Sequence, residues 1–264
     1  MCMIGGVIVV RHLRLDFTAP ANFHLGMKHF ISCATLALVL TGGSFSIQAQ
    51  TNDASSAPVS STADREKATL EKHIKPVMAA LNLNDADKEA KVREVLAAQI
   101  QALTTWHAQN DAQIKALWND FNKARGKQNV TNAGAALAKI DGVYASFKPQ
   151  HEKFVSNLSS VLTPEQVETV KDVLTVNKVK VTYDVYLQIF PKLTDGQKAV
   201  VLDYLKAARE EAIDASSMTE KSAFFKKYKI KIEDDYLTAQ GYDPKQARKD
   251  FAAKQKSAAV DDQK

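Results

Sequence analysis

The stretch that decides the fold is LAAQIQALTTWHAQNDAQIKALWNDF, from Leu96 to Phe121. Its core-type residues return after four residues and then after three, which places them on one stripe of an α-helix. They are Leu96, Ile100, Leu103, His107, Asn110, Ile114, Leu117 and Phe121. A stripe with this spacing is typical of a helix that buries one face against a partner helix.

A second stripe with the same spacing follows the loop ARGKQNVTN, residues 124–132. Its members are Ala133, Leu137, Ile140, Tyr144, Phe147, His151, Phe154, Leu158 and Val161. Two such stripes joined by a short loop predict a long antiparallel helical hairpin over residues 84–161. Pro149 lies inside the second stripe, and we expect it to kink that helix or to split it in two.

Polar residues inside the stripes allow two interpretations. Pairing Phe121 with Ala133 across the loop predicts which later positions face one another: Asn110 with Tyr144, His107 with Phe147, and Leu103 with His151. Either the two histidines form a metal or ligand site, or Asn110 hydrogen-bonds to Tyr144 and the histidines occupy a part of the helix–helix contact that water reaches. Because no carboxylate occupies a neighbouring stripe position, we favour the second interpretation and expect neither metal nor cofactor.

The segments LTPEQ, from Leu162, and LTDGQ, from Leu193, have the pattern of a helix-starting capping box. In each box the threonine caps the helix and the glutamine reaches back to the amide of the cap residue. The boxes pair Thr163 with Gln166 and Thr194 with Gln197. A weaker copy pairs Asn84, as the cap, with Asp87. Helix initiation alone therefore explains the repeated motif.

Composition agrees with a helical chain. The 264 residues are 45% hydrophobic and 25% charged, with 10 Gly and 7 Pro. This balance is globular rather than disordered, and it is poor in residues that break helices. We predict a single all-α domain over residues 64–264, in which the hairpin packs against a C-terminal bundle over residues 162–258.

The N-terminal region has the pattern of an export signal. From Met27 a short basic start is followed by an apolar run and then by small residues up to Ala49, which is typical of a signal peptide over residues 27–49 cleaved near Ala49. We interpret residues 1–26 as a misassigned upstream extension and residues 50–63 as a disordered spacer. The expected location is therefore the periplasm or the exterior. The apolar run is too short for a stable membrane anchor, because spanning takes about 20 residues.

Cleavage would limit the available chemistry. The only cysteines, Cys2 and Cys33, lie upstream of Ala49, so disulfides and thiol nucleophiles are excluded from the mature chain. The full chain has 35 basic and 30 acidic residues, with the two signs interspersed, so we expect no nucleic-acid partner. The sequence contains no G-x-S-x-G, H-E-x-x-H, Walker or dinucleotide motif, which favours a non-catalytic role over an enzyme.

A further set of short motifs runs through the second half of the chain. They are Val181-Thr182-Tyr183, Leu193 to Gln197, Ala208-Arg209-Glu210, Ser216-Ser217, Glu220-Lys221, Lys227-Tyr228 and Gly241-Tyr242-Asp243. This succession resembles a secreted bacterial family, domain of unknown function 3826, which is often described as sugar-binding. The chain departs from that pattern at Ala215, where a glycine is expected, and at Phe224-Phe225, where the expected pair is Trp-Phe. The capping boxes are also similar to those of Spy-type periplasmic chaperones.

The resemblance implies a secreted, non-catalytic helical binding protein whose candidate partner is an oligosaccharide. Tyrosines beside charged residues are the best candidates for the rim of a polar-ligand site. The candidate ligand-binding residues are Tyr183, Asp184, Arg209, Glu210, Asp214, Tyr228, Tyr242 and Asp243. Glu210 and Asp214 are also spaced as on a solvated helix face, with Arg209 nearby to pair. The alternative function is a chaperone-like or scaffold protein that offers an exposed helical surface to protein clients.

Overall fold

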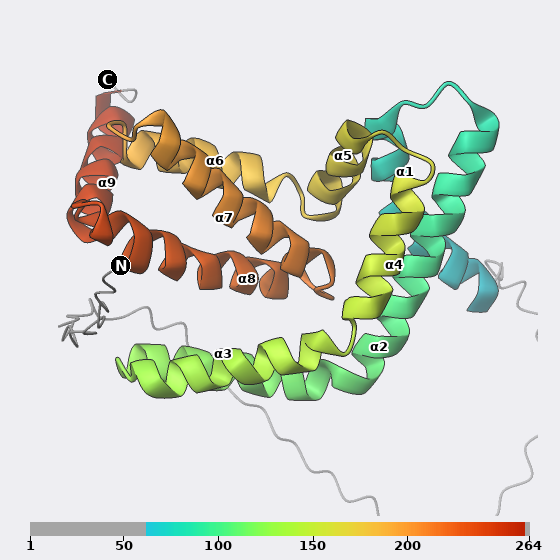
Figure 1. The fold of residues 1–264 in the computed structure, drawn as a ribbon, viewed down its shortest axis with the longest axis horizontal. Helices are drawn as coiled ribbons and strands as arrows, with labels where there is room; N and C mark the ends of the chain where they lie inside the picture. The colour runs from blue at the N-terminus through green and yellow to red at the C-terminus, as the bar shows by residue number, and fades with distance from the viewer. Residues whose placement is uncertain (1–61, 262–264) are drawn as a thin grey trace, which may run out of the picture. The chain divides into compact units, whose positions relative to one another are not determined.

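A computed structural model describes residues 62–261, all within the compact unit Ser60–Lys264. Every regular element in this part of the chain is a helix, which confirms the all-α prediction (Figure 1). The predicted upstream extension and signal peptide lie outside the described residues, as does the predicted spacer up to residue 61. No helix within residues 62–261 is both long and apolar enough to cross a membrane.

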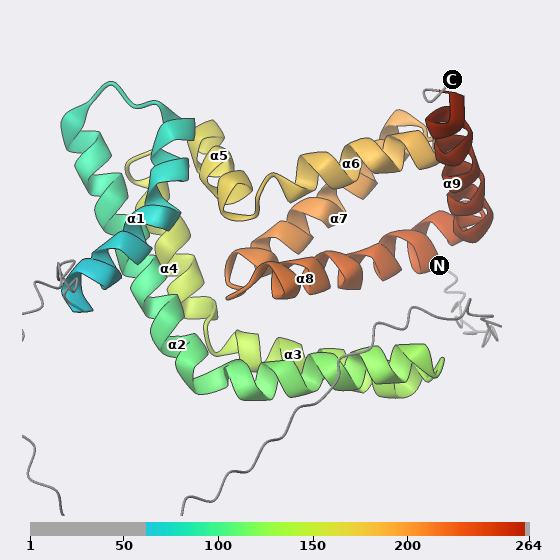
Figure 2. The same cartoon turned by 180° about the vertical axis from the view of Figure 1, so that it is seen from behind.

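The hairpin is the longest feature of the fold. Helix α2 (Ala86–Gly126) pairs first with α3 (Val130–Ala145) and then with α4 (Lys148–Ser159), as Figures 1 and 2 show. The second arm is split as predicted, because Pro149 lies in the first turn of α4. Helix α2 itself bends along its length while remaining one continuous helix (Figure 1).

An aromatic contact joins α2 to the break between α3 and α4. The indole Nε1 of Trp106 donates to the Ser146 hydroxyl at 3.0 Å, and the Trp106 ring lies 5.2 Å from that of Phe147. The predicted hydrogen bond between Asn110 and Tyr144 is wrong. The Asn110 amide instead donates to the Trp106 carbonyl at 2.8 Å. A short side chain can satisfy itself on its own helix one turn back, which frees Tyr144 to reach beyond the hairpin.

The remaining helices pack on both ends of this hairpin. They are α1 (Thr62–Leu81), α5 (Pro164–Leu174), α6 (Lys178–Ile189), α7 (Asp195–Ile213), α8 (Met218–Ile230), the π-helix η1 (Lys231–Leu237) and α9 (Pro244–Asp261). Helix α1 packs on α5 and α2, whereas α7 lies between α6 and α8. Helix α9 packs on α6 and η1. Helix α5 therefore packs with the N-terminal helices, although it follows the hairpin in sequence.

Two apolar cores hold these helices together. The first, here called the aliphatic core, has the buried members Ile74, Val77, Met78, Leu81, Val92, Leu96, Phe154, Leu158, Leu162, Val167, Val170 and Ile213. The second, here called the aromatic-rich core, is built between the far half of α2, α3 and helices α6 to α8. Its buried aromatic members are Trp118, Phe121, Tyr186, Phe190, Phe224, Phe225 and Tyr228.

The helix caps set where α2, α5 and α7 begin. Thr163 and Thr194 each accept a hydrogen bond from the N3 amide, and the N3 glutamine returns one to the cap amide, so both capping boxes are formed. The third cap differs from the prediction by one residue. Asp85, rather than Asn84, accepts from the amides of Asp87 and Lys88 at 3.0 Å. Asp85 has the extended backbone of an N-cap residue, with φ −130° and ψ 112°, so its side chain can reach these amides.

Candidate functional site

The C-terminal end of α7 carries three of the predicted ligand-binding residues, and they are not on a solvated face. Arg209 is 2% exposed and Asp214 is 7% exposed, while Glu210 is half-buried. The expectation of an exposed charged face is therefore wrong. Helices α4, α5 and α8 supply partners that cover this end of α7, so the charges form a buried network.

Arg209 belongs to the structural part of this network. Its guanidinium lies 2.6 Å from the Asp172 carboxylate and 2.7 Å from that of Glu168, both on α5. These are charge-assisted hydrogen bonds of the strong class. They tie α7 to α5 and leave the guanidinium engaged with protein groups rather than directed into a cavity.

Glu210 and Asp214 hold His151 of α4 between them. The His151 Nδ1 atom lies 2.9 Å from Asp214 Oδ2, and the two form an ion pair without the alignment of a hydrogen bond. The other ring nitrogen, Nε2, lies 3.7 Å from the Glu210 carboxylate. Asp214 and then Glu210 stabilise the imidazolium against its burial and raise the pKa of His151 to about 9. This ring is therefore positively charged at neutral pH.

The two carboxylates respond differently to the same surroundings. Burial works to raise the pKa of Glu210, but its contacts with His151, Lys171 and Arg209 outweigh burial and lower that pKa to about 2. The Lys171 ammonium lies 2.9 Å from the Glu210 carboxylate. Asp214 is buried more deeply, and burial raises its pKa despite the contact with His151. Glu210 is thus the firmly ionised member of the pair.

Asp214 also joins this network to a second cluster on α2. Its backbone carbonyl lies 2.6 Å from Nε2 of the buried His107 ring. Because a carbonyl only accepts, Nε2 of His107 carries a proton. The other ring nitrogen, Nδ1, lies 2.7 Å from Asp111 Oδ1 one turn along the helix.

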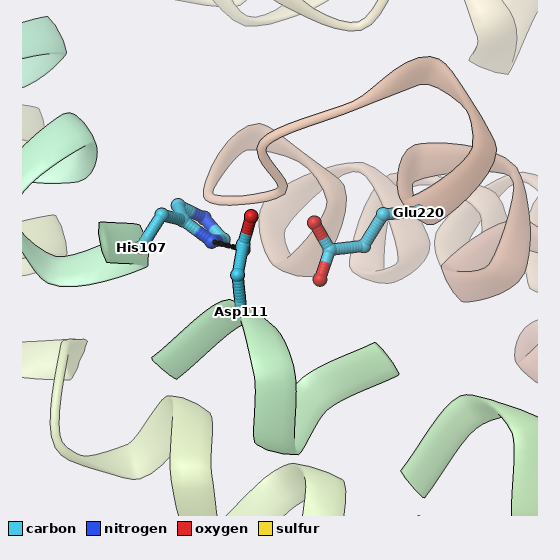
Figure 3. A group of neighbouring side chains, drawn as sticks. All are labelled: His107, Asp111 and Glu220. Carbon is cyan, nitrogen blue, oxygen red and sulfur yellow. Dashed lines mark hydrogen bonds and ion pairs between the residues drawn. The ribbon is translucent and has the colours of Figure 1, made fainter. Parts of the chain in front are cut away.

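Glu220 completes the second cluster from the first turn of α8 (Figure 3). It accepts from the Tyr144 hydroxyl at 2.5 Å and from the Ser216 amide at 2.8 Å. The ligand-type atoms of His107, Asp111 and Glu220 all lie within 4.8 Å of one another. The sequence-based argument considered only stripe positions, and the two carboxylates beside His107 come from elsewhere: Asp111 lies off the stripe on the same helix, and Glu220 lies on a distant helix.

A cavity of about 290 Å³ opens beside His151. It is here called the acidic cavity, and its polar lining consists of Asp141, Tyr144, Lys148, His151, Glu210, Glu211 and Asp214. Its apolar lining comes from Ala145, from the ring of Tyr144 and, beneath these, from the almost fully buried Phe224. Hydrogen-bond acceptors therefore line one part of this cavity and aromatic carbon lines another.

Of the predicted site residues, Glu210 and Asp214 line the acidic cavity. Tyr228 lies behind it, and its hydroxyl donates to the Glu211 carboxylate at 2.8 Å. Burial and this carboxylate raise the pKa of Tyr228, so its hydroxyl stays protonated.

The other four predicted residues lie away from the acidic cavity. Asp184 pairs with Lys180 at 2.7 Å on the surface of α6, and Tyr183 packs at the edge of the aromatic-rich core. The Tyr242 hydroxyl donates to the Lys192 carbonyl at 3.0 Å, and Asp243 accepts from the Gln246 amide at the start of α9. Their contacts explain them as parts of helix packing and capping.

Sequence reasoning did not assign Tyr144, Glu211 or Lys171 to the site. Tyr144 carried a usable signal, since it is a polar-tipped residue within a buried stripe. Glu211 directly follows the predicted Glu210 on α7, and this adjacency was its signal. Lys171 carried none, because a charged residue on a short helix is normally solvated. Only the packing of α5 on α7 brings Lys171 to the site.

The chain matches a protein family whose description names no activity. A family described as "Protein of unknown function (DUF3826)" matches residues 67–257, which is most of the described chain. No curated protein matches the sequence. The chain therefore belongs to this family of unknown function, DUF3826.

Proposed function

We propose that this protein is exported and binds a carbohydrate, without catalysis, in the acidic cavity. The observation that carries the proposal is the pairing of carboxylates with aromatic carbon around one small space. Glu210 and Glu211 lie on one helix beside Asp214, while the half-buried Tyr144 contributes ring surface and packs on the buried Phe224. Sugar hydroxyls donate to carboxylates, and the apolar face of a sugar ring packs on aromatic carbon.

The size of the cavity agrees with a small ligand. About 290 Å³ falls at the lower end of the range of roughly 300–1,000 Å³ that is usual for small-molecule sites. This volume favours one or two sugar units over a long chain held along its length. The resemblance to a family described as sugar-binding supports the same ligand class.

The charge state supports binding rather than catalysis. Glu210 and His151 hold each other in their charged forms, with a pKa of about 2 for the carboxyl and about 9 for the ring. A general acid or base works best with a pKa near the operating pH. Groups locked in this way are better suited to fixed hydrogen bonding than to moving protons at neutral pH.

The chaperone-like alternative receives less support. Within residues 67–257 the large apolar residues that are exposed are Val130, Val176, Val181 and Met218. They belong to three separate parts of the chain, namely the start of α3, the region around the start of α6 and the start of α8. A client-binding surface needs a broad contiguous apolar patch.

Thermal unfolding of the purified protein against a panel of plant and bacterial oligosaccharides tests the proposal. A sugar present at about 100 times its dissociation constant should add about 2.7 kcal/mol of stability, which raises the unfolding midpoint by several degrees. The Glu211→Gln variant should weaken this shift, because Glu211 lines the cavity. Glu94→Gln, on the exposed side of α2 and away from the cavity lining, is the matched control and should keep it.

A dose-dependent shift with one sugar class that is lost in Glu211→Gln supports the proposal. A flat response to the whole panel contradicts carbohydrate binding for the sugars tested. A shift that Glu211→Gln and Glu94→Gln retain equally would place any binding elsewhere on the protein. The intact mass of the exported protein would show separately whether cleavage occurs near Ala49.

A further inference from the structure

The cluster of His107, Asp111 and Glu220 lies outside the acidic cavity and has the composition of a metal site (Figure 3). It supplies one imidazole nitrogen and two carboxylates from two helices that are far apart in sequence. In Figure 3 the three side chains point toward one another. We propose that these three residues bind a divalent transition-metal ion such as Zn²⁺.

The orientation of His107 is the first argument. Its Nε2–H donates to the Asp214 carbonyl at 2.6 Å, which leaves Nδ1 as the nitrogen that faces Asp111 and Glu220. Histidines that bind metals almost always donate their other ring N–H to a carbonyl or carboxylate, which fixes the ring and makes it a better ligand. The Asp214 carbonyl has this role here.

The distances between the ligand atoms are the second argument. All three lie within 4.8 Å of one another, and His107 Nδ1 is 2.7 Å from Asp111. The ligand atoms of a tetrahedral Zn²⁺ site lie about 3.3 Å apart, given metal–ligand distances of about 2.0–2.1 Å. Asp111, which is partly exposed, would move away from the ring slightly while the Glu220 carboxylate moves closer.

The charges are the third argument. Asp111 and Glu220 bring two negative charges next to one ring, and the Lys115 ammonium, 3.5 Å from Asp111 on the solvent side, is a partner for Asp111 alone. A divalent cation bound to the neutral ring neutralises both. Glu220 also keeps acceptor capacity for the ion, since its contacts with Tyr144 and Ser216 do not use all of the lone pairs of a carboxylate.

The ligand set selects the class of ion. Imidazole nitrogen suits zinc and its transition-metal neighbours, whereas Ca²⁺ and Mg²⁺ prefer sites made of oxygen alone. Three protein ligands leave the fourth tetrahedral position open, as in zinc sites that take an external ligand. Asp111 and Glu220 line a cavity of about 450 Å³, so the ion would have access to solvent there.

Isothermal titration of untagged, chelator-treated protein with Zn²⁺ tests the site, with Ca²⁺ titrated in parallel. We expect one saturable Zn²⁺ per chain and much weaker binding of Ca²⁺. Asp111→Asn and Glu220→Gln should each weaken Zn²⁺ binding by about 100-fold, the upper range for changes to groups that only support metal ligands. Asp111 is partly exposed, so its variant should fold even if the Glu220 variant does not.

Two controls separate this site from surface binding. Asp120→Asn makes the same substitution on the exposed side of α2, and His73→Gln removes an exposed histidine near the same region; both should leave Zn²⁺ binding unchanged. The proposal is overturned if wild-type protein shows no saturable Zn²⁺ binding, or if Asp111→Asn binds as tightly as wild type. Loss of binding in His73→Gln alone would identify an adventitious surface ion.

Discussion

The aliphatic core and the aromatic-rich core differ in what they can hold at their edges. The aliphatic core has Phe154 as its single buried aromatic side chain among the described residues, whereas the other core contains seven. Aromatic residues such as Tyr144 and Tyr228 combine ring surface with a hydroxyl, so they can pack and still donate to buried carboxylates. Aliphatic side chains cannot do this.

Several of the buried charges accordingly lie where the two cores meet. The end of α7 belongs to both, since Ile213 packs in the aliphatic core and Ala212 in the aromatic-rich core. Arg209, Glu210 and Asp214 lie on this same stretch of helix. The candidate site is therefore a polar seam between the two cores, formed by these three residues and their partners, rather than a hollow within one core.

The largest expected effect tests whether the two cores unfold together. Leu158→Ala opens the aliphatic core at a fully buried position and should cost about 2–5 kcal/mol of unfolding free energy. The two tryptophans of the chain, Trp106 and Trp118, both pack with the aromatic-rich core. Their fluorescence therefore follows one core during urea unfolding, while far-UV circular dichroism follows both.

If the cores are coupled, Leu158→Ala lowers the unfolding midpoint equally by both probes. An unchanged fluorescence midpoint, with a dichroism curve that divides into two steps, would show that the cores are independent. Val130→Ala, at a position 71% exposed, is the control and should change stability by less than about 0.5 kcal/mol.

Loss of Arg209 from the polar seam should lower the stability of the protein. Arg209→Met leaves the Asp172 and Glu168 carboxylates without their partner, and breaking a buried ion pair costs about 3–5 kcal/mol. Because both carboxylates retain contact with water, we expect Arg209→Met to lower the free energy of unfolding by about 3 kcal/mol, as measured by urea unfolding. Lys180→Met breaks an exposed pair with Asp184 and should cost no more than about 1 kcal/mol. Equal losses of unfolding free energy in the two variants would show that the ion pairs of the polar seam are no stronger than exposed ones.

The pH dependence of His151 gives a smaller effect. Its pKa is about 9 in the folded protein against 6.5 ordinarily, so its stabilisation is complete below pH 6.5 and disappears as the pH rises through 9. After allowance for screening by water, we expect His151→Gln to be less stable than wild type by about 1–2 kcal/mol at pH 6. The difference should be smaller at pH 9.5.

Comparing the two proteins at each pH removes the contribution of Lys221. Burial lowers the pKa of Lys221 to about 8, so this residue makes folding more favourable as the pH rises above 8, opposite in sign to His151. Urea unfolding at both pH values measures the difference directly. A gap between wild type and His151→Gln that stays constant from pH 6 to pH 9.5 would mean that His151 is not held as an imidazolium.

The smallest expected effect concerns the helix caps. Asp85→Ala removes the acceptor for two amides at the start of α2 and should cost about 1 kcal/mol. Asn84→Ala should cost only a few tenths, because Asn84 is not the cap. Urea unfolding of the two variants side by side decides between these adjacent residues, and a larger loss for Asn84→Ala would reverse the assignment.

Much of the fold follows from local patterns. Three predicted features depend only on residues within a few turns of helix. They are the two apolar stripes that begin at Leu96 and Ala133, the break at Pro149 and the two Thr–Gln capping boxes. The one-residue error at Asn84 has the same origin, since Asn and Asp are both good caps and only the backbone conformation at each position distinguishes them.

The candidate site follows from longer-range packing. His107 and Asp111 are one helical turn apart and could have been linked from the sequence. Glu220 lies beside them only because α8 packs against α7, which brings the first turn of α8 next to this part of α2. Glu210 and Asp214 have the spacing of a solvated face, and that inference fails because α4 and α5 cover them.

The sequence by itself determined that the chain is helical, where its principal helices start and break, and that it resembles DUF3826. Those properties depend on hydrophobic periodicity and on hydrogen bonding between neighbouring residues. Only the tertiary structure decided which charged residues are buried and which meet one another. The physical reason is that a charge becomes buried when residues far away in sequence cover it and supply its partners, as His151 and Lys171 do for Glu210.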